Sequence, residues 1–264
     1  MEPATPDFLY HYTSINNFAL ILKNRTIRFS CLENLNDLTE GETSDLGRFG
    51  RYVFVSCWTE TPDEHIPLWN MYTPSMAGVR IKLPSDPFER YEFIGDKSKG
   101  TFGYYPNSIV PEEEIIAKNY MVYPASFKLH KVEYTDDGTL LKPTVYKKTS
   151  RGESFQLALL GKHKPKEWLF EQEWRYLFWI VPSIPVDPSD KHYSKRHLRA
   201  VRSAINAKEL PINQFFLKIN DKAFEQMEVI LGPKHTEGDI IMVDALIRTY
   251  NPKAGFELST LKIK

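Results

Sequence analysis

The chain has 264 residues, of which 42% are hydrophobic and 26% charged, and its 34 basic and 34 acidic side chains give no net charge at pH 7. This composition is typical of a globular protein and excludes a wholly disordered chain. No stretch approaches the roughly 18 apolar residues of a membrane helix, and the acidic, proline-containing start differs from a signal peptide. We therefore expect one cytoplasmic domain over residues 1–264 without membrane contact, in which any nucleic-acid contact is local.

The N-terminal part of the chain predicts strands and one helix. Residues 15–24 place Phe18, Ile21 and Leu22 at helical spacing, and Ser14 stands where it can cap the first turn. The polar stretch 32–47 is expected to be a loop with short helical turns. Apolar and β-branched runs predict strands at residues 8–14, 26–31, 51–58 and 78–84.

The rest of the chain is less regular. About residues 84–150 contain many Pro, Gly and Tyr residues, and we expect a variable insertion with one or two strands there. Because short loops rather than regular helices separate several strands, the sequence predicts an α+β fold with a mixed, largely antiparallel sheet. Beyond the insertion, we expect a helix at 150–164, strands at 167–181 and 227–233, a helix at 236–250 and a last strand from 256.

The predicted strand at 167–181 carries an unusual row of charges. A period of two places Glu171, Glu173 and Arg175 on one face. Since a sheet interior rejects unpaired charge, this face must meet water, a cleft or a salt-bridge network. Both a structural ion-pair ladder and a functional site are compatible with this pattern. The opposite face would hold Phe170, Gln172, Trp174, Tyr176 and Phe178.

Other candidate residues stand near the N-terminus. His11 and Thr13 point the same way at the end of the first predicted strand, where a ligand can meet side chains and backbone together. The aromatic residues Trp58, Trp69 and Tyr72 fit either the core or a stacking platform. No phosphate loop, dinucleotide fingerprint, nucleophile elbow or metal-ligand spacing occurs, so we expect no metal. The two cysteines, Cys31 and Cys57, are expected to be small buried residues rather than a disulfide.

The order of the motifs HYTS, LND, SCW, LWNMY, EQEWR and LGP resembles a family of uncharacterised bacterial proteins, a domain of unknown function, over nearly the whole chain. That family is in turn similar to the ADP-ribosyltransferase superfamily, whose members carry an H-x-T or H-G-T element on the first strand and a Glu on a late strand. The resemblance implies a split sheet with helices around it, and NAD as the substrate.

Residue roles follow from the resemblance. Glu173 would be the catalytic residue, and Glu171 would orient the acceptor. His11 would bind the adenosine-side ribose of NAD, and Thr13 with the nearby backbone would help to hold the nicotinamide amide. Tyr12 is assigned to the same cofactor site. Phe29 stands near where a Tyr that stacks on nicotinamide is expected, so that either Tyr72 or Trp58 takes its place or there is no stacking partner. Trp69 is also assigned to cofactor binding.

Three functions remain open at this point. The first is an NAD-dependent ADP-ribosyltransferase or NAD glycohydrolase, acting as a bacterial toxin or defence effector on a nucleic acid or a protein. The second is a non-catalytic binding or regulatory module in which Glu173 is locked to Arg175. The third is an RNA 2′-phosphotransferase-like activity. Contacts to a macromolecular substrate are assigned to Arg175 and to the basic run at 191–202, a run that also fits a solvated helix face and includes Lys195, Arg196 and Arg199.

Overall fold

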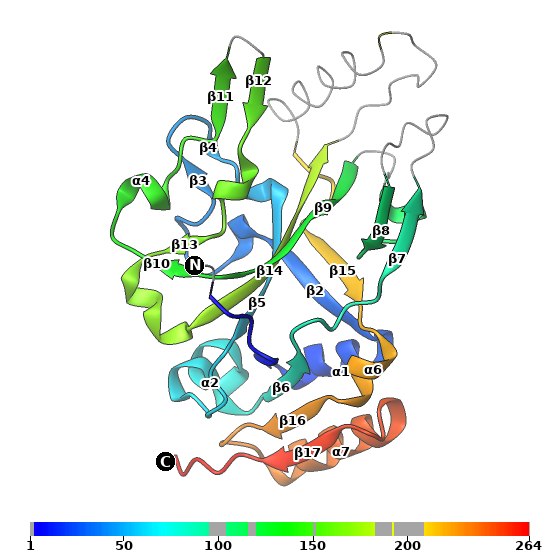
Figure 1. Ribbon diagram of the computed structural model, residues 1–264. Helices are drawn as coiled ribbons and strands as arrows, with labels where there is room; N and C mark the ends of the chain where they lie inside the picture. Colours follow the sequence, from blue (N-terminus) through cyan, green and yellow to red (C-terminus); the bar gives the residue numbers. More distant parts are fainter. Residues whose placement is uncertain are drawn as a thin grey trace.

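The structure is a computed structural model, and it describes residues 3–94, 104–115, 120–149, 152–182, 192 and 209–263. Nine strands form one mixed, mostly antiparallel sheet with helices around it (Figure 1), so the predicted α+β class is confirmed. The strands of this sheet are β1 (Phe8–Thr13), β2 (Thr26–Cys31), β5 (Val53–Thr59), β6 (Val79–Pro84), β9 (Tyr120–Lys131), β14 (Glu173–Pro182), β15 (Gln214–Lys218), β16 (Glu228–Leu231) and β17 (Gly255–Leu258).

Shorter elements surround the main sheet. The α-helices are α1 (Ile15–Asn24), α2 (Ile66–Tyr72), α3 (Glu112–Ile115), α4 (Gly138–Leu141), α6 (Asp221–Glu225) and α7 (Glu237–Tyr250). The 3-10 helices are η1 (Leu32–Asn34), η2 (Gly50–Tyr52), η3 (Pro74–Met76), η5 (Leu157–Leu159) and η6 (Lys166–Glu171). Two-stranded pairs are β3 (Glu42–Thr43) with β4 (Gly47–Arg48), β7 (Tyr91–Ile94) with β8 (Tyr104–Ser108), β10 (Glu133–Tyr134) with β13 (His163–Lys164), and β11 (Tyr146–Thr149) with β12 (Gly152–Phe155).

One half of the main sheet consists of β1, β6, β16 and β17. β6 pairs antiparallel with β1 on one side and with β16 on the other, and β17 runs parallel to β16. Helix α7 connects the two parallel strands, as a parallel pair requires a crossover connection. The strands and the helix predicted in these regions are confirmed.

The other half is centred on β14, which pairs antiparallel with β5 and with β9. On the far side of β5, β2 pairs antiparallel with β15. Among the described strands β9 pairs with β14, and its Pro124 lies between Tyr123 and Lys128, where the ladder with β14 is irregular and a proline is tolerated.

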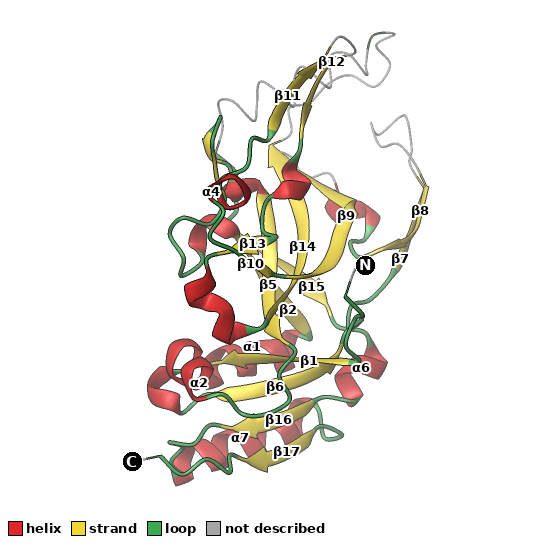
Figure 2. Ribbon diagram, turned by 60° about the vertical axis from the view of Figure 1, so that its left-hand side comes forward, coloured by secondary structure: helices red, strands yellow, loops and turns green. Residues whose placement is uncertain are grey.

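The two halves diverge along one edge of β5. β1 pairs with β5 only where Tyr10 meets Thr59, and β2 pairs with β5 only at Ser30 and Cys31. Between these contacts, residues 56–58 of β5 pair with β14 on one edge but with neither β1 nor β2 on the other. The sheet is therefore split here, and Figure 2 shows the strands of the two halves running at a steep angle to each other.

A single large cluster of buried apolar side chains holds both halves together. Leu9 and Ile81 come from one half, and Phe54 and Phe178 from the other. A smaller cluster on the other face of β5 and β14 includes Val55. On the side of the sheet that faces the main core, apolar side chains of the two halves therefore pack directly against each other.

Three sequence predictions are wrong in this part of the chain. Residues 150–164 do not form a helix; the described part consists of β12, η5 and β13. Leu157 and Leu160 are buried three residues apart, a spacing that a 3-10 turn shares with a helix, and Gly161 ends the turn at φ +78.

The strand predicted at 167–181 begins only at Glu173. Residues Lys166–Glu171 form η6, and Gln172 adopts the left-handed region at φ +43. Phe170 and Gln172 therefore do not share a strand face with Trp174. The region 84–150 also contains more than one or two strands, since β7, β8, β9, β10 and β11 all lie in it and β9 belongs to the main sheet.

Candidate functional site

A cleft of about 480 Å³ opens at the split of the sheet. Its walls come from β1, α1, β2 and β5, with further residues from α2 and β15, and this volume lies within the range of small-molecule sites. His11 and Glu173 both line the cleft although they are 162 residues apart in the sequence (173 − 11). Their strands, β1 and β14, do not pair with each other; each pairs with β5.

The His11 side chain binds a backbone carbonyl of β5 at a position where β1 does not pair with that strand. Its Nδ1 lies 2.8 Å from the carbonyl oxygen of Cys57, in the stretch of β5 that β1 has left. Because a carbonyl only accepts, Nδ1 is the donor, and Nε2 keeps a lone pair that can accept a hydrogen bond from a ligand. Burial lowers the pKa of His11, which favours this neutral form. The ring of Trp58 lies 5.0 Å from the imidazole and fixes its orientation.

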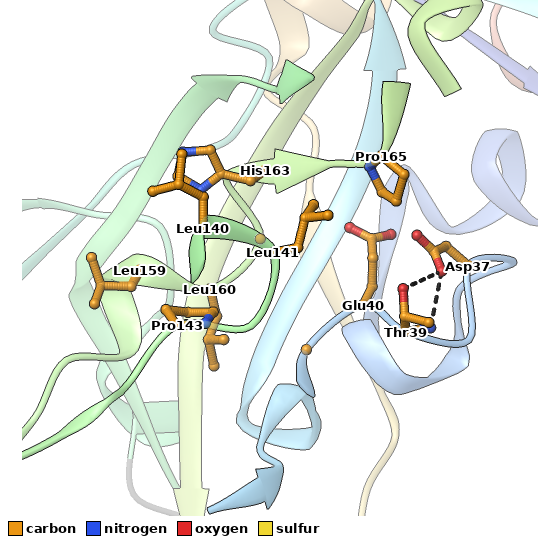
Figure 3. A pocket seen from close by; sticks show the side chains of 12 residues that line it. Asp37, Thr39, Glu40, Leu140, Leu141, Pro143, Leu159, Leu160, His163 and Pro165 are labelled. Carbon is orange, nitrogen blue, oxygen red and sulfur yellow. Dashed lines mark hydrogen bonds between the residues drawn. The ribbon is translucent and has the colours of Figure 1, made fainter. Parts of the chain in front are cut away.

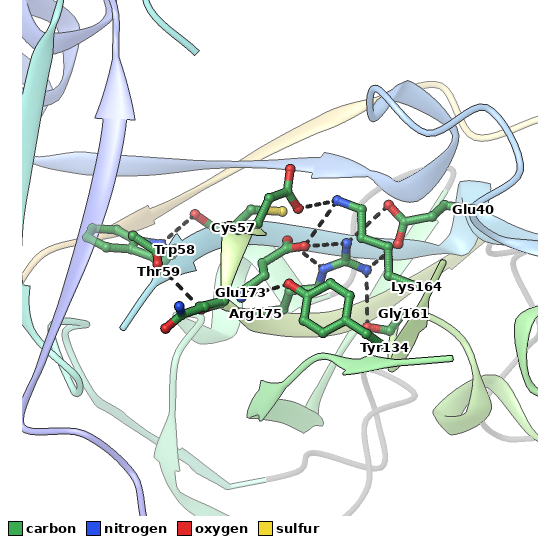
Figure 4. Close-up of polar contacts among 12 residues, drawn as sticks. Glu40, Cys57, Trp58, Thr59, Tyr134, Gly161, Lys164, Glu173 and Arg175 are labelled. Atoms are coloured by element: carbon green, nitrogen blue, oxygen red, sulfur yellow. Dashed lines mark hydrogen bonds and ion pairs between the residues drawn. The ribbon is translucent and has the colours of Figure 1, made fainter. Parts of the chain in front are cut away.

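Arg175 anchors a buried charge cluster below the cleft (Figure 4). Its Nε and Nη2 donate to the two carboxylate oxygens of Glu173 at 2.6 and 2.8 Å, and both terminal nitrogens donate to Glu40, the Nη2 contact being 3.1 Å. Nη1 also donates to the Gly161 carbonyl at 3.2 Å. The guanidinium is fully buried and shares its charge between two carboxylates.

Lys164 connects this cluster to the second predicted carboxylate. Its Nζ lies 2.5 Å from Oε2 of Glu171 and 3.3 Å from Oε2 of Glu173. The other oxygen of Glu171 accepts a hydrogen bond from the hydroxyl of Tyr72, which α2 brings to the cleft. The ammonium also lies 4.3 Å from the centre of the Trp168 ring, a favourable cation–π position.

The buried cluster holds three carboxylates, from Glu40, Glu171 and Glu173, against two cations, Lys164 and Arg175. Carboxyl groups therefore outnumber cations in this cluster. Burial raises the pKa of both Glu40 and Glu171. Burial opposes ionisation of Glu173 too, but the charges of Arg175 and Lys164 outweigh it and lower the pKa of this carboxyl to about 2.

The neighbouring carboxyl groups of Glu173 and Glu171 therefore differ in pKa and can have different chemical roles. Glu173 stays ionised and is held in one orientation, which suits the stabilisation of a positive charge that develops in the cleft. Glu171, with its raised pKa, can take or give a proton. The thiol of Cys57 is hydrogen-bonded to Glu173 as well, and burial raises its pKa, so it stays protonated.

Glu40 lies on the side of the cluster that faces away from the cleft. It borders a second, water-sized cavity of about 10 Å³, together with Asp37 and Thr39 from its own loop (Figure 3). The adjoining Gly41 has φ +77, and a Cβ on it would lie 2.5 Å from the Cα of Gly50. Only glycine permits this close approach of the loop to η2, which sets Glu40 against Arg175.

Two aromatic residues predicted to bind the cofactor belong to the core instead. Phe29 is fully buried against Phe178, at 5.1 Å between ring centres, and is absent from the cleft lining. Trp69 is also fully buried, and its Nε1 donates to Glu64. In both cases the sequence shows an aromatic residue but not the side of the element on which it lies.

The remaining predicted residues of β1, β5 and α2 border the cleft. The Thr13 hydroxyl accepts a hydrogen bond from Asn17 Nδ2 at 3.2 Å. Tyr12 turns its ring edge-on against Trp69 and its hydroxyl accepts from the His65 backbone N–H, so its side chain serves packing. Trp58 is buried, and its indole N–H donates to the Ser56 hydroxyl. Tyr72 is partly exposed, and its hydroxyl contacts Glu171 of the charge cluster. Of the predicted aromatic residues, Tyr72 therefore combines exposure to the cleft with contact to the charged groups.

The assignment of Arg175 as a substrate contact is wrong, because its guanidinium is inaccessible and fully occupied by carboxylates and a carbonyl. The predicted contacts of the basic run lie outside the described residues, namely Lys195, Arg196 and Arg199.

Three residues of the site are not predicted by the sequence: Lys164, Glu40 and Arg28. Lys164 falls in the segment predicted to be a helix, and its buried position follows from the parallel pairing of β13 with β10. Glu40 lies in a polar loop without any distinguishing pattern, 135 residues from Arg175. The polar, outward position of Arg28 on a predicted strand is the one signal that could have indicated a cleft residue.

No family model, curated protein sequence or solved structure matches this chain. The resemblance to the ADP-ribosyltransferase superfamily therefore remains a prediction. Within the described ranges, no helix is long and apolar enough to span a membrane, and no group of three or more His, Cys, Asp or Glu side chains is arranged to hold a metal ion. The two cysteines are free thiols.

Proposed function

We propose that this protein cleaves the bond between nicotinamide and ribose in NAD, as an ADP-ribosyltransferase or an NAD glycohydrolase. One observation carries the proposal: a cleft with His11 on one wall has an ionised, oriented Glu173 at its base. The resemblance of the HYT and EQEWR motifs to that superfamily agrees with this assignment.

Cleavage of the nicotinamide–ribose bond requires a carboxylate beside the ribose and a group that accepts a proton. When the glycosidic C–N bond breaks, nicotinamide leaves with the bonding electron pair as a neutral molecule, and positive charge develops on the ribose. A carboxylate placed in advance, such as Glu173, stabilises that charge in the transition state. Water or a hydroxyl, amine or ring nitrogen of the acceptor then bonds to C1′, and its proton passes to Glu171 and on to solvent.

His11 supplies orientation in this scheme. Its Nε2 can accept a hydrogen bond from a ribose hydroxyl, while the Nδ1 contact to Cys57 holds the ring. A neutral imidazole is needed for this role, and burial favours that form.

The test is release of nicotinamide from NAD, measured by chromatography with protein in excess so that slow hydrolysis is detected. We expect Glu173→Gln to lower the rate by about 100-fold to 1000-fold, because the amide keeps the volume but loses the charge. Glu40→Gln is the matched control: it removes the other carboxylate of Arg175 outside the cleft and should stay within about tenfold of the wild type. An unchanged rate in Glu173→Gln would eliminate the role of this residue.

A second candidate function is a ligand-binding module without turnover. It is favoured by the contacts of Glu173, whose two oxygens are already bound by Arg175 and Lys164. This candidate predicts that NAD binds to the wild-type protein and is recovered intact. The same assay separates the two candidates, since only the enzyme releases nicotinamide.

A further inference from the structure

The end of the cleft away from the charge cluster is formed by β2 and β15. Along these strands the outward side chains alternate with buried ones, and the outward Arg28 lies directly opposite the outward Phe216. Directly opposed residues of antiparallel strands have neighbouring side chains, with Cβ atoms about 4.5–5.5 Å apart. Both residues line the cleft, so one wall presents a guanidinium beside an aromatic ring.

Arg28 is unusual among the described arginines. Neither a hydrogen bond nor an ion pair engages its guanidinium in the described ranges. By contrast, such contacts are made by Arg25, Arg48, Arg51, Arg80, Arg90, Arg175 and Arg248. All three carboxylates of the charge cluster lie around Arg175 and Lys164 instead, so the cleft has a negative end and a positive end. The charge of Arg28 reaches the middle of the cleft, where it adds to burial in lowering the pKa of His11.

Phe216 is also unusual for its position. Its ring is 51% exposed, whereas its neighbours Phe215 and Leu217 are buried. The surrounding lining is rich in amides, which donate and accept hydrogen bonds at once. These amide side chains belong to Asn24, Asn34, Asn36 and Gln214. An exposed aromatic ring with amides and an arginine beside it is the set of groups that recognises a base and its phosphate.

We propose that the β2–β15 end of the cleft binds the adenosine diphosphate half of the dinucleotide, with Arg28 on the diphosphate and Phe216 stacked on the adenine. This inference rests on the proposed function, because it places the nicotinamide half at Glu173. The carboxylate of Glu173 there faces the cationic nicotinamide ring, and Arg28 faces the anionic diphosphate.

The test uses ADP alone, so that it does not depend on turnover. Calorimetric titration of the full-length wild-type protein should show ADP binding that weakens as salt increases. We expect Arg28→Gln to weaken binding by about tenfold or more and to flatten the salt dependence, since a charge-assisted contact is lost. Phe216→Leu keeps an apolar side chain but removes the ring. This variant should bind ADP about tenfold more weakly and bind inorganic diphosphate with unchanged affinity.

Two exposed residues of α7 provide matched controls. Arg248→Gln removes a surface guanidinium, and Tyr250→Leu removes an aromatic ring that is 40% exposed; both should bind ADP as the wild type does. The proposal is overturned if the wild type does not bind ADP, if the Arg28 and Phe216 variants bind it unchanged, or if a single-stranded oligonucleotide binds here and ADP does not. Wild-type protein that binds ADP through these residues but releases no nicotinamide would support this subsite and refute the proposed enzyme.

Discussion

At the scale of single residues, the site depends on buried ionisable groups that are held against one another. Arg175 and Lys164 are surrounded by Glu40, Glu171 and Glu173, and none of the five has a substantial exposed fraction. Burying so many charges is costly, and replacing one partner leaves another uncompensated. Such a cluster contributes little to the net stability of the fold, but it holds the carboxylate of Glu173 in one position.

The pKa of Glu173 leads to a prediction about acid stability. Because its folded-state pKa is about 2, below the ordinary value near 4.3, its contribution is complete above pH 5 and is lost as the pH falls toward 2. Between pH 7 and pH 3 the wild type should lose about 2 kcal/mol of unfolding free energy through this group. Glu173→Gln should be less stable at pH 7, and its deficit should shrink by about 2 kcal/mol at pH 3, as measured by urea unfolding.

The control for this measurement is Glu257→Gln, which changes an exposed carboxylate on β17. Because this side chain is exposed, the variant should differ from the wild type at pH 7 by less than about 0.5 kcal/mol. A constant deficit for Glu173→Gln across the same range would show that Glu173 is not ionised in the way we infer.

At the scale of elements, α1 is the connection that spans the split. It joins β1 to β2, and its residues Asn17, Leu20 and Ile21 line the cleft while Phe18 and Leu22 are buried in the core. The helix begins after Ser14, whose hydroxyl accepts from the Asn17 backbone N–H at 3.1 Å. The position of α1 therefore decides both the stability of the connection and the shape of one wall of the cleft.

Removing this cap should affect stability and ligand binding together. Ser14→Ala should lower the unfolding free energy by about 1 kcal/mol, because a backbone N–H loses its partner, and should weaken ADP binding through the shifted wall. Thr236→Ala removes the corresponding cap of α7, away from the cleft, and should cost a similar amount without changing ADP affinity. Equal ADP affinities in both variants would show that α1 does not shape the site. Urea unfolding and calorimetry provide the two measurements.

At the scale of the whole molecule, the split does not divide the protein into separate cores. The main sheet is continuous through β5, and the largest buried cluster takes side chains from both halves. We therefore expect both halves to unfold together.

Leu9→Ala tests this coupling. Leu9 of β1 is fully buried, so its truncation should lower the unfolding free energy by about 2–5 kcal/mol. Far-UV circular dichroism and tryptophan fluorescence should shift to the same lower midpoint, since Trp69 reports on one half and Trp174 on the other. Leu258→Ala on the exposed side of β17 should change stability by less than about 0.5 kcal/mol. Two separate transitions in the wild type or in Leu9→Ala would contradict a single cooperative unit.

The amino-acid sequence by itself determined the elements whose pattern is local. The strands around His11 and Val79, helix α1 with its Ser14 cap, and helix α7 all follow from periodicity and end signals over a few residues. The common face of Glu173 and Arg175 likewise follows from the period of two along one strand.

Only the tertiary structure decided where those elements meet. The sequence does not show that β1 and β2 diverge from β5, that Phe29 faces the core, or that Lys164 and Glu40 come from distant segments to share the charges of Glu173 and Arg175. The physical reason is that periodicity reports the side of an element on which a residue lies, but not which remote side chain will lie against it. Burial and charge pairing are settled by those remote contacts, and so the cleft, its two charged ends and the position of Arg28 in its lining emerge only when the chain has folded.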